Sequence, residues 1–96
     1  MNVQSIISLL KAYNPQKIIL FGSRASGQAG GESDWDIAVI KDTDDPYHDR
    51  VIAARRLLRT TVAVDLFVFT QEELNYYQAK NPLIHEIVAK GKVIYG

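Results

Sequence analysis

The fold of this chain is decided by Lys17-Ile18-Ile19-Leu20-Phe21-Gly22-Ser23, followed ten residues later by Asp34-Trp35-Asp36. The apolar run closed by Gly22 predicts a short buried strand. A second strand is expected over residues 34–41, and the β-branched run at 62–69 predicts a third. Because side chains alternate along a strand, Asp34 and Asp36 should point the same way, about 6 to 7 Å apart. Two carboxylates at that spacing favour a cation between them.

The segments around these strands predict helices. Residues 3–13 carry apolar side chains at i, i+3, i+4 and i+7, which is typical of an amphipathic helix. Pro46 suits the first turn of a helix that runs to about residue 59. Residues 25–31 are small and are expected to form a turn and loop.

The last third of the chain predicts two more helices and a strand. Thr70-Gln71-Glu72-Glu73 has the pattern of a capping box and opens a helix to about residue 79. Asn81-Pro82 begins a second helix that ends near Gly91. Residues 92–95 are expected to add an edge strand. The fold class is therefore α+β (α/β-like), a small mixed sheet with helices packed mainly on one face.

Composition narrows the classes of function. The 96 residues are expected to form one domain over 1–96, and 11 basic residues against 11 acidic ones give a formal net charge of zero. Without a basic run, polymeric nucleic acid is a poor candidate partner. The absence of cysteine excludes disulfides and thiolate metal sites. With no basic, apolar leader and no membrane-length apolar run, we expect a soluble cytoplasmic protein.

Asp65 is the most unusual acid, because its neighbours in the predicted third strand are apolar. A carboxylate there is costly unless it is paired, hydrogen-bonded or bound to metal. If the second and third strands are neighbours, Asp34, Asp36 and Asp65 converge, and Mg²⁺ suits a site made of oxygen ligands. Trp35 should point to the opposite, core side. The alternative for Asp34 and Asp36 is a turn or cap at the start of a strand.

Gly22, Ser23 and Arg24 form a candidate phosphate-binding turn. Glycine lets the backbone approach a ligand closely, and Ser23 can cap a helical turn or offer its hydroxyl. Backbone amides at such a point suit an anion, and Arg24 adds a positive charge that could reach phosphate oxygens. A plain surface turn would also explain a Gly-Ser pair.

The order of these motifs resembles the nucleotidyltransferases of the DNA polymerase beta superfamily, most closely the minimal nucleotidyltransferases. The resemblance runs from Lys17 to Asp65 and includes the tail at residues 82–95. It implies a palm fold in which Gly22 and Ser23 hold ATP. By the same resemblance, Asp34 and Asp36 bind two magnesium ions, and Asp65 completes the site and helps to activate a hydroxyl. The implied reaction moves AMP to that hydroxyl and releases pyrophosphate.

The sequence departs from the family pattern at two positions. Ser26 stands where many minimal members have a second arginine, and Gln28 stands where an acid is common. Both changes leave the metal ligands intact. They put nucleotide affinity and substrate choice in question rather than the class of reaction.

The resemblance also implies a partner. Minimal nucleotidyltransferases of this kind pair with a small helical HEPN toxin and act as antitoxins by adenylylating one of its tyrosines, and a homo- or hetero-oligomer would fit. Two alternatives stay open: an antitoxin that binds without catalysis, and nucleotidyl transfer to a small molecule. The sequence leaves the base, the acceptor and the oligomeric state undecided.

Overall fold

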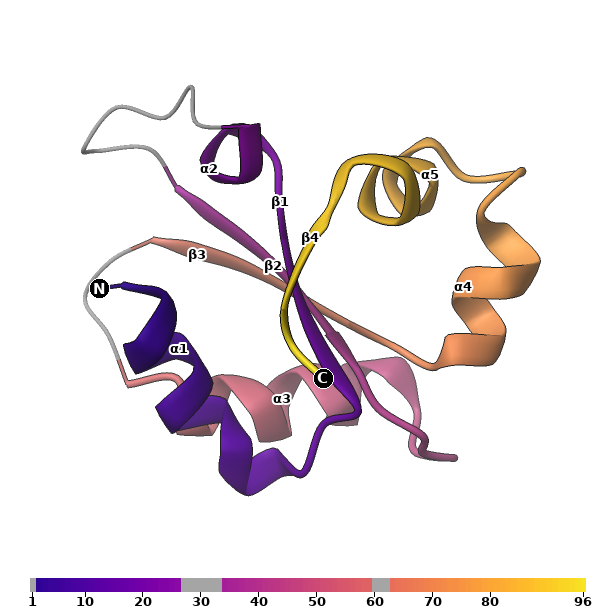
Figure 1. Cartoon of the computed structure of the whole chain (residues 1–96). Coiled ribbons are helices and arrows are strands. Elements are labelled where there is room, and N and C mark those ends of the chain that lie inside the picture. The colour runs from indigo at the N-terminus through magenta and orange to yellow at the C-terminus, as the bar shows by residue number, and fades with distance from the viewer. Residues whose placement is uncertain (1, 27–33, 60–62) are drawn as a thin grey trace.

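The computed structural model describes residues 2–26, 34–59 and 63–96, and it contains a four-stranded mixed sheet of order β3-β2-β1-β4 (Figure 1). β1 (Lys17–Phe21) is antiparallel to both β2 (Trp35–Ile40) and β4 (Lys92–Tyr95), whereas β3 (Val64–Phe69) is parallel to β2. The predicted strands, including the edge strand, are confirmed. Residue 62, the predicted start of the third strand, lies outside the described residues.

The larger core lies between one face of the sheet and two helices (Figure 1). α1 (Val3–Leu10) begins at a capping box on Asn2 and continues as a 3₁₀ turn, η1 (Lys11–Tyr13), and α3 (Tyr47–Leu57) packs beside it. The helices and the sheet contribute these buried residues to the core: Ile6, Leu10, Ile18, Leu20, Trp35, Ile37, Val39, Ala54, Leu58, Val64, Leu66 and Val68. The prediction that Trp35 faces the core is confirmed.

The opposite face carries a smaller core under α4 (Gln71–Tyr77) and α5 (Pro82–Lys90) (Figure 1). The side chains buried there are Ile19, Phe21, Ala38, Ile40, Leu74, Ile84 and Ile87, with Phe67, Phe69 and Leu83 packed against them. The chain is thus an α+β protein, as predicted, and the bulk of its core lies on the face covered by α1 and α3.

The ends of the helices follow local chemistry. Thr70 and Glu73 make the predicted capping box, and the side chain of Asn81 accepts from two backbone amides at the start of α5. Pro46 is the residue before α3 rather than part of its first turn. A short helix, α2 (Ser23–Ser26), occupies the start of the segment predicted as a turn and loop. Residues 27–33, including Gln28, lie outside the described residues.

A partly buried ion pair, which the sequence did not reveal, joins α3 to α4. Arg50 is only 7% exposed, and its guanidinium lies 2.7 Å from the Glu73 carboxylate. Arg50 also donates to the carbonyl of Asp45, and Glu73 accepts from the backbone of Thr70. The pair therefore fixes both helix starts. Within the described residues, no helix is long and apolar enough to cross a membrane.

Candidate active site

The predicted site residues gather at one end of the sheet, where β1 ends and β2 and β3 begin (Figure 1). Asp36 pairs with Phe21 of β1 on one side and with Asp65 of β3 on the other. Registered neighbours in a sheet point to the same side, and adjacent strands are about 4.8 Å apart. The prediction that the second and third strands bring these two acids together is confirmed.

Burial and the pairing with Asp65 make Asp36 a weaker acid. The pKa of Asp36 is raised, first by partial burial, and then by the charge of Asp65 and a side-chain hydrogen bond with it. The charges of Glu86 and Asp34 act in the same direction. Carboxylates in this arrangement repel each other when ionised, and a cation or a proton relieves the repulsion. The pair is therefore suited to hold a divalent cation.

Asp34 stands apart from this pair. It is exposed and lies one residue before β2. In the part of the chain that the structure describes, no three His, Cys, Asp or Glu side chains stand together as a metal-binding group. Asp36 and Asp65 are thus the two of the three predicted carboxylates that the strand pairing brings side by side. For Asp34, the role of third ligand stays a prediction.

Gly22 packs directly against the Asp36 carboxylate. Its φ is +72°, a conformation that glycine adopts readily, and an added Cβ would lie 3.1 Å from Cγ of Asp36 and still closer to its Oδ2. Any larger residue would collide with the carboxylate in its present position. The position after β1 therefore requires glycine, because Asp36 occupies the space that a side chain would fill.

Ser23 and Arg24 follow this glycine in α2. Ser23 is exposed and is the first residue of the short helix, directly after Gly22. The guanidinium of Arg24 lies 4.2 Å from the centre of the Trp35 ring, on the core face of β2. Arg24 and Trp35 share the lining of a cavity of about 570 Å³ with Lys92 of β4. In this conformation Ser23 follows the glycine that packs against Asp36, whereas Arg24 stacks on the other face of β2.

Aromatic side chains form the base of the site. Phe21 and Phe67 lie on the acid face with ring centres 5.8 Å apart, and Phe67 stacks with Phe69 at 6.3 Å. Phe67 and Phe69 both pack against the smaller core. This apolar base explains why burial is the leading cause of the raised Asp36 pKa.

Glu86 is an acid that the sequence did not assign to the site. It is half-buried in α5, and its charge contributes to the raised pKa of Asp36. Fifty residues separate the two in the sequence, so only the packing of α5 on the acid face brings them near. The site is therefore more anionic than the Asp-x-Asp motif alone indicates.

This arrangement suits chemistry on phosphates. Carboxylate oxygens are the ligands that hard cations prefer, and such cations bind triphosphates. Asp65 is exposed, so a second molecule can reach the same point. The site thus combines a cation-attracting pair of carboxylates with access from solvent at Asp65.

Comparisons with known proteins point in the same direction. The family described as polymerase beta, nucleotidyltransferase, matches residues 4–96. No curated protein matches the sequence.

Solved structures give a second line of comparison. A chain from a crystal structure of a toxin–antitoxin with AMP-PNP is 28% identical, with a TM-score of 0.64, and the match covers 100% of this chain and 74% of that one. A chain of the MntA-HepT toxin–antitoxin is 26% identical with a TM-score of 0.55, and the match covers 98% of this chain and 69% of that one.

Proposed function

Because the chain belongs to the polymerase beta nucleotidyltransferase family, we propose that it transfers AMP from ATP to a hydroxyl group and releases pyrophosphate. The fold is the nucleotidyltransferase fold, as the sequence predicted. The observation that carries the proposal is the registered pair of Asp36 and Asp65, with Gly22 packed directly against the Asp36 carboxylate.

In the proposed reaction, the acceptor oxygen forms a bond to the α-phosphorus of ATP. The bond from that phosphorus to the oxygen bridging to the β-phosphate breaks, and pyrophosphate leaves with that oxygen. Asp65, exposed at the start of β3, takes the proton of the acceptor hydroxyl. Because phosphoryl transfer requires little covalent chemistry from the protein, positioning of the two substrates supplies much of the rate.

The residues present fit magnesium. The donor set is all oxygen, and the pKa of Asp36 is raised by burial and then by the charge of Asp65, which a bound cation would offset. We propose that Asp36 and Asp65 hold Mg²⁺, with Asp34 as a further ligand and two ions in the complete site. When bound, magnesium would neutralise triphosphate charge and lower the pKa of the acceptor hydroxyl.

The triphosphate is proposed to lie over Gly22 and Ser23. Gly22 permits close approach of the phosphates, and Ser23 presents its hydroxyl at the start of α2. Arg24 is the third proposed contact. Its guanidinium would have to move from the Trp35 ring to reach the phosphates, so its contribution should be smaller than that of Ser23.

For the acceptor, we propose a tyrosine on a small helical HEPN-type partner, which would make this chain an antitoxin. Two observations support this. The similar structures include a toxin–antitoxin with AMP-PNP and the MntA-HepT toxin–antitoxin. Asp65 is also exposed, so the hydroxyl of another protein can approach it.

The test is label transfer to the protein that co-purifies with the tagged chain. ATP labelled on the α-phosphate should label the partner when Mg²⁺ is present, whereas ATP labelled on the γ-phosphate should not. Label from the γ-phosphate would show phosphoryl rather than nucleotidyl transfer. A tight complex that stays unlabelled would contradict catalysis and support neutralisation by binding alone. Label that appears only on an added small molecule would contradict the protein acceptor.

A further inference from the structure

A small cavity of about 190 Å³ lies where the end of β3 meets three helices, on the same face of the sheet as Asp65. Its lining consists of three aromatic rings, one carboxylate, one amide and one aliphatic side chain: Tyr47, Phe69, Tyr77, Glu73, Asn81 and Ile84. Small-molecule pockets usually exceed about 300 Å³. This cavity, the aromatic cavity, is therefore of a size for a single side chain.

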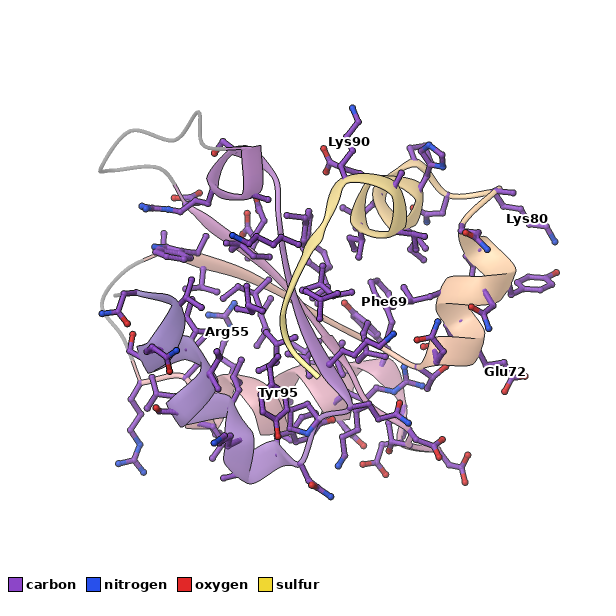
Figure 2. All side chains as sticks on the ribbon, in the orientation of Figure 1. Arg55, Phe69, Glu72, Lys80, Lys90 and Tyr95 are labelled. Carbon is purple, nitrogen blue, oxygen red and sulfur yellow. The ribbon has the colours of Figure 1, made fainter. Side chains whose placement is uncertain are left out.

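The aromatic rings are held in place and remain open to solvent. Tyr47 and Phe69 pack against each other with ring centres 5.7 Å apart. Figure 2 shows Phe69 on the side of the sheet where α4 lies, and Tyr77 of α4 lines the same cavity. Tyr47 and Tyr77 are 42% and 43% exposed. A side chain of another molecule can thus reach their faces.

The surroundings of the aromatic cavity favour a positive charge. An adjoining groove shares Glu73 and Tyr77 with it and also holds Asp44, Glu72 and Arg50. Arg50 is the cation of that lining, and it is already bonded to Glu73 at 2.7 Å. Because Glu73 is paired with Arg50, the carboxylates of Asp44 and Glu72 leave the lining of the adjoining groove anionic.

The chain itself shows this preference on the neighbouring tyrosine. The ammonium group of Lys80 lies 3.7 Å from the centre of the Tyr76 ring. Tyr76 in turn packs edge-on against Tyr77, with ring centres 4.7 Å apart. The ammonium group of Lys80 thus already lies over the ring of Tyr76, whereas the ring of Tyr77 lines the aromatic cavity.

We propose that the aromatic cavity binds a lysine or arginine side chain of a partner protein. Cations over aromatic faces gain from the ring quadrupole, and the gain is larger where the ring is partly desolvated, as at Phe69. Exposed tyrosines are also enriched in protein interfaces, and arginine is their frequent partner there. The aromatic rings, the negative charge nearby and the small volume together favour one basic side chain as the occupant of the cavity.

The position of the aromatic cavity relates it to the acids. Phe69 is four residues from Asp65 on the same face of β3, which at about 3.3 Å per residue is about 13 Å. A partner anchored in the cavity would therefore extend toward Asp65. This relation rests on the proposed function, but the binding of a basic side chain does not.

The test uses amide resonances of the isotope-labelled chain during titration with three probes. We expect N-acetyl-argininamide and N-acetyl-lysinamide to give saturable shifts at Phe69, Tyr77, Asn81 and Ile84. The neutral probe N-acetyl-norleucinamide should bind at least about tenfold more weakly than the two basic probes. Equal binding of all three probes, or no saturable shift with either basic probe, would overturn the proposal.

Two variants locate the site. Tyr77→Leu should weaken binding of the basic probes about tenfold, whereas Tyr77→Phe should keep most of it. Val88→Ala is the control, because Val88 is similarly exposed and lies outside the lining of the cavity and of the adjoining groove. Equal loss in Val88→Ala would refute the assignment, and if Tyr77→Leu fails to fold, the probe comparison decides alone. The assay contains no nucleotide, so its failure is distinguishable from failure of the transferase proposal.

Discussion

Asp36 of β2 and Asp65 of β3 are registered neighbours across a parallel strand pair, with the smaller core beneath them. Burial and the charge of Asp65 together raise the pKa of Asp36. Two carboxylates one strand apart weaken the fold unless a proton or a cation compensates them. Local destabilisation of this kind is typical of a functional site.

The first prediction concerns the stability of the metal-free chain. The pKa of Asp36 is higher in the folded state than in the unfolded chain, where an aspartate has a pKa of about 3.9. The fold therefore loses stability as the pH rises from about 3.9 through the higher pKa of the folded state. Asp36→Asn removes this loss. We expect its melting temperature in EDTA to exceed that of the wild type by about 2 to 6 °C near neutral pH, since the site is partly exposed.

The pH dependence is the control for this prediction. The difference between Asp36→Asn and the wild type should shrink as pH falls toward about 4, where the carboxyl group protonates. Addition of Mg²⁺ should raise the melting temperature of the wild type more than that of the variant. If the two melting temperatures differ by the same amount at all pH values, the raised pKa of Asp36 is not the cause of the difference.

The second prediction uses Gly22. Gly22→Ala should destabilise the chain by about 1 to 3 kcal/mol, because φ is +72° and the new Cβ meets the Asp36 carboxylate. Part of that loss should disappear in Gly22→Ala combined with Asp36→Ala, since the collision partner is gone. Urea unfolding of the two single variants and the double variant measures the coupling. Strictly additive effects would show that the two residues do not meet.

The fold was predictable wherever local chemistry decided it. Alternation and β-branched residues located the strands, and the cap at Thr70 located the start of α4. The same alternation placed Trp35 in the core and Asp36 on the opposite face. These features depend on neighbours in the sequence, which a single sequence contains.

Contacts between distant residues were not predictable in this way. Arg50 and Glu73 are 23 residues apart, and nothing in the pattern of α3 marks Arg50 as buried. Glu86 approaches Asp36 only because α5 packs over the acid face. Arg24 carries a charge expected at phosphates, yet it stacks on Trp35, whose ring the sequence could place only on the core side.

The third prediction concerns the Arg50–Glu73 pair. Burial alone would raise the pKa of Glu73, but hydrogen bonds from Arg50 and Thr70 and the charge of Arg50 lower it overall. The pair therefore stabilises the fold at pH values above about 4.3, which is the pKa of a glutamate in the unfolded chain. This stabilisation is lost as the pH falls through the lower pKa of Glu73 in the folded state. Glu73→Gln should lose about 1 to 2 kcal/mol at neutral pH, because Glu73 is a third exposed.

The measurement is urea unfolding at neutral and at acid pH. The stability deficit of Glu73→Gln should narrow in acid. Glu72→Gln, at the exposed neighbouring position, is the matched control and should change stability little. A deficit that does not narrow in acid would argue against the ion pair as its source.

The fourth prediction separates the two side chains of α2. Ser23→Ala should weaken binding of a non-hydrolysable ATP analogue about tenfold or more, since hydrogen bonds to charged groups contribute about 1.5 to 3 kcal/mol. Arg24→Ala should weaken it less and should change the fluorescence of Trp35, over which the guanidinium lies. Ser8→Ala, exposed in α1, is the control. A larger effect from Arg24→Ala than from Ser23→Ala would mean that Arg24 leaves Trp35 for the phosphates.

The central claim is that Asp36 and Asp65 form the centre of AMP transfer to a protein hydroxyl. The most direct measurement is the intact mass of the co-purified partner after incubation with ATP and Mg²⁺. With the wild type, and with Asp49→Asn at an exposed position of α3, the partner should gain the mass of one AMP. With Asp65→Asn it should stay unmodified. An unmodified partner with the wild type, or full modification by Asp65→Asn, would contradict the claim.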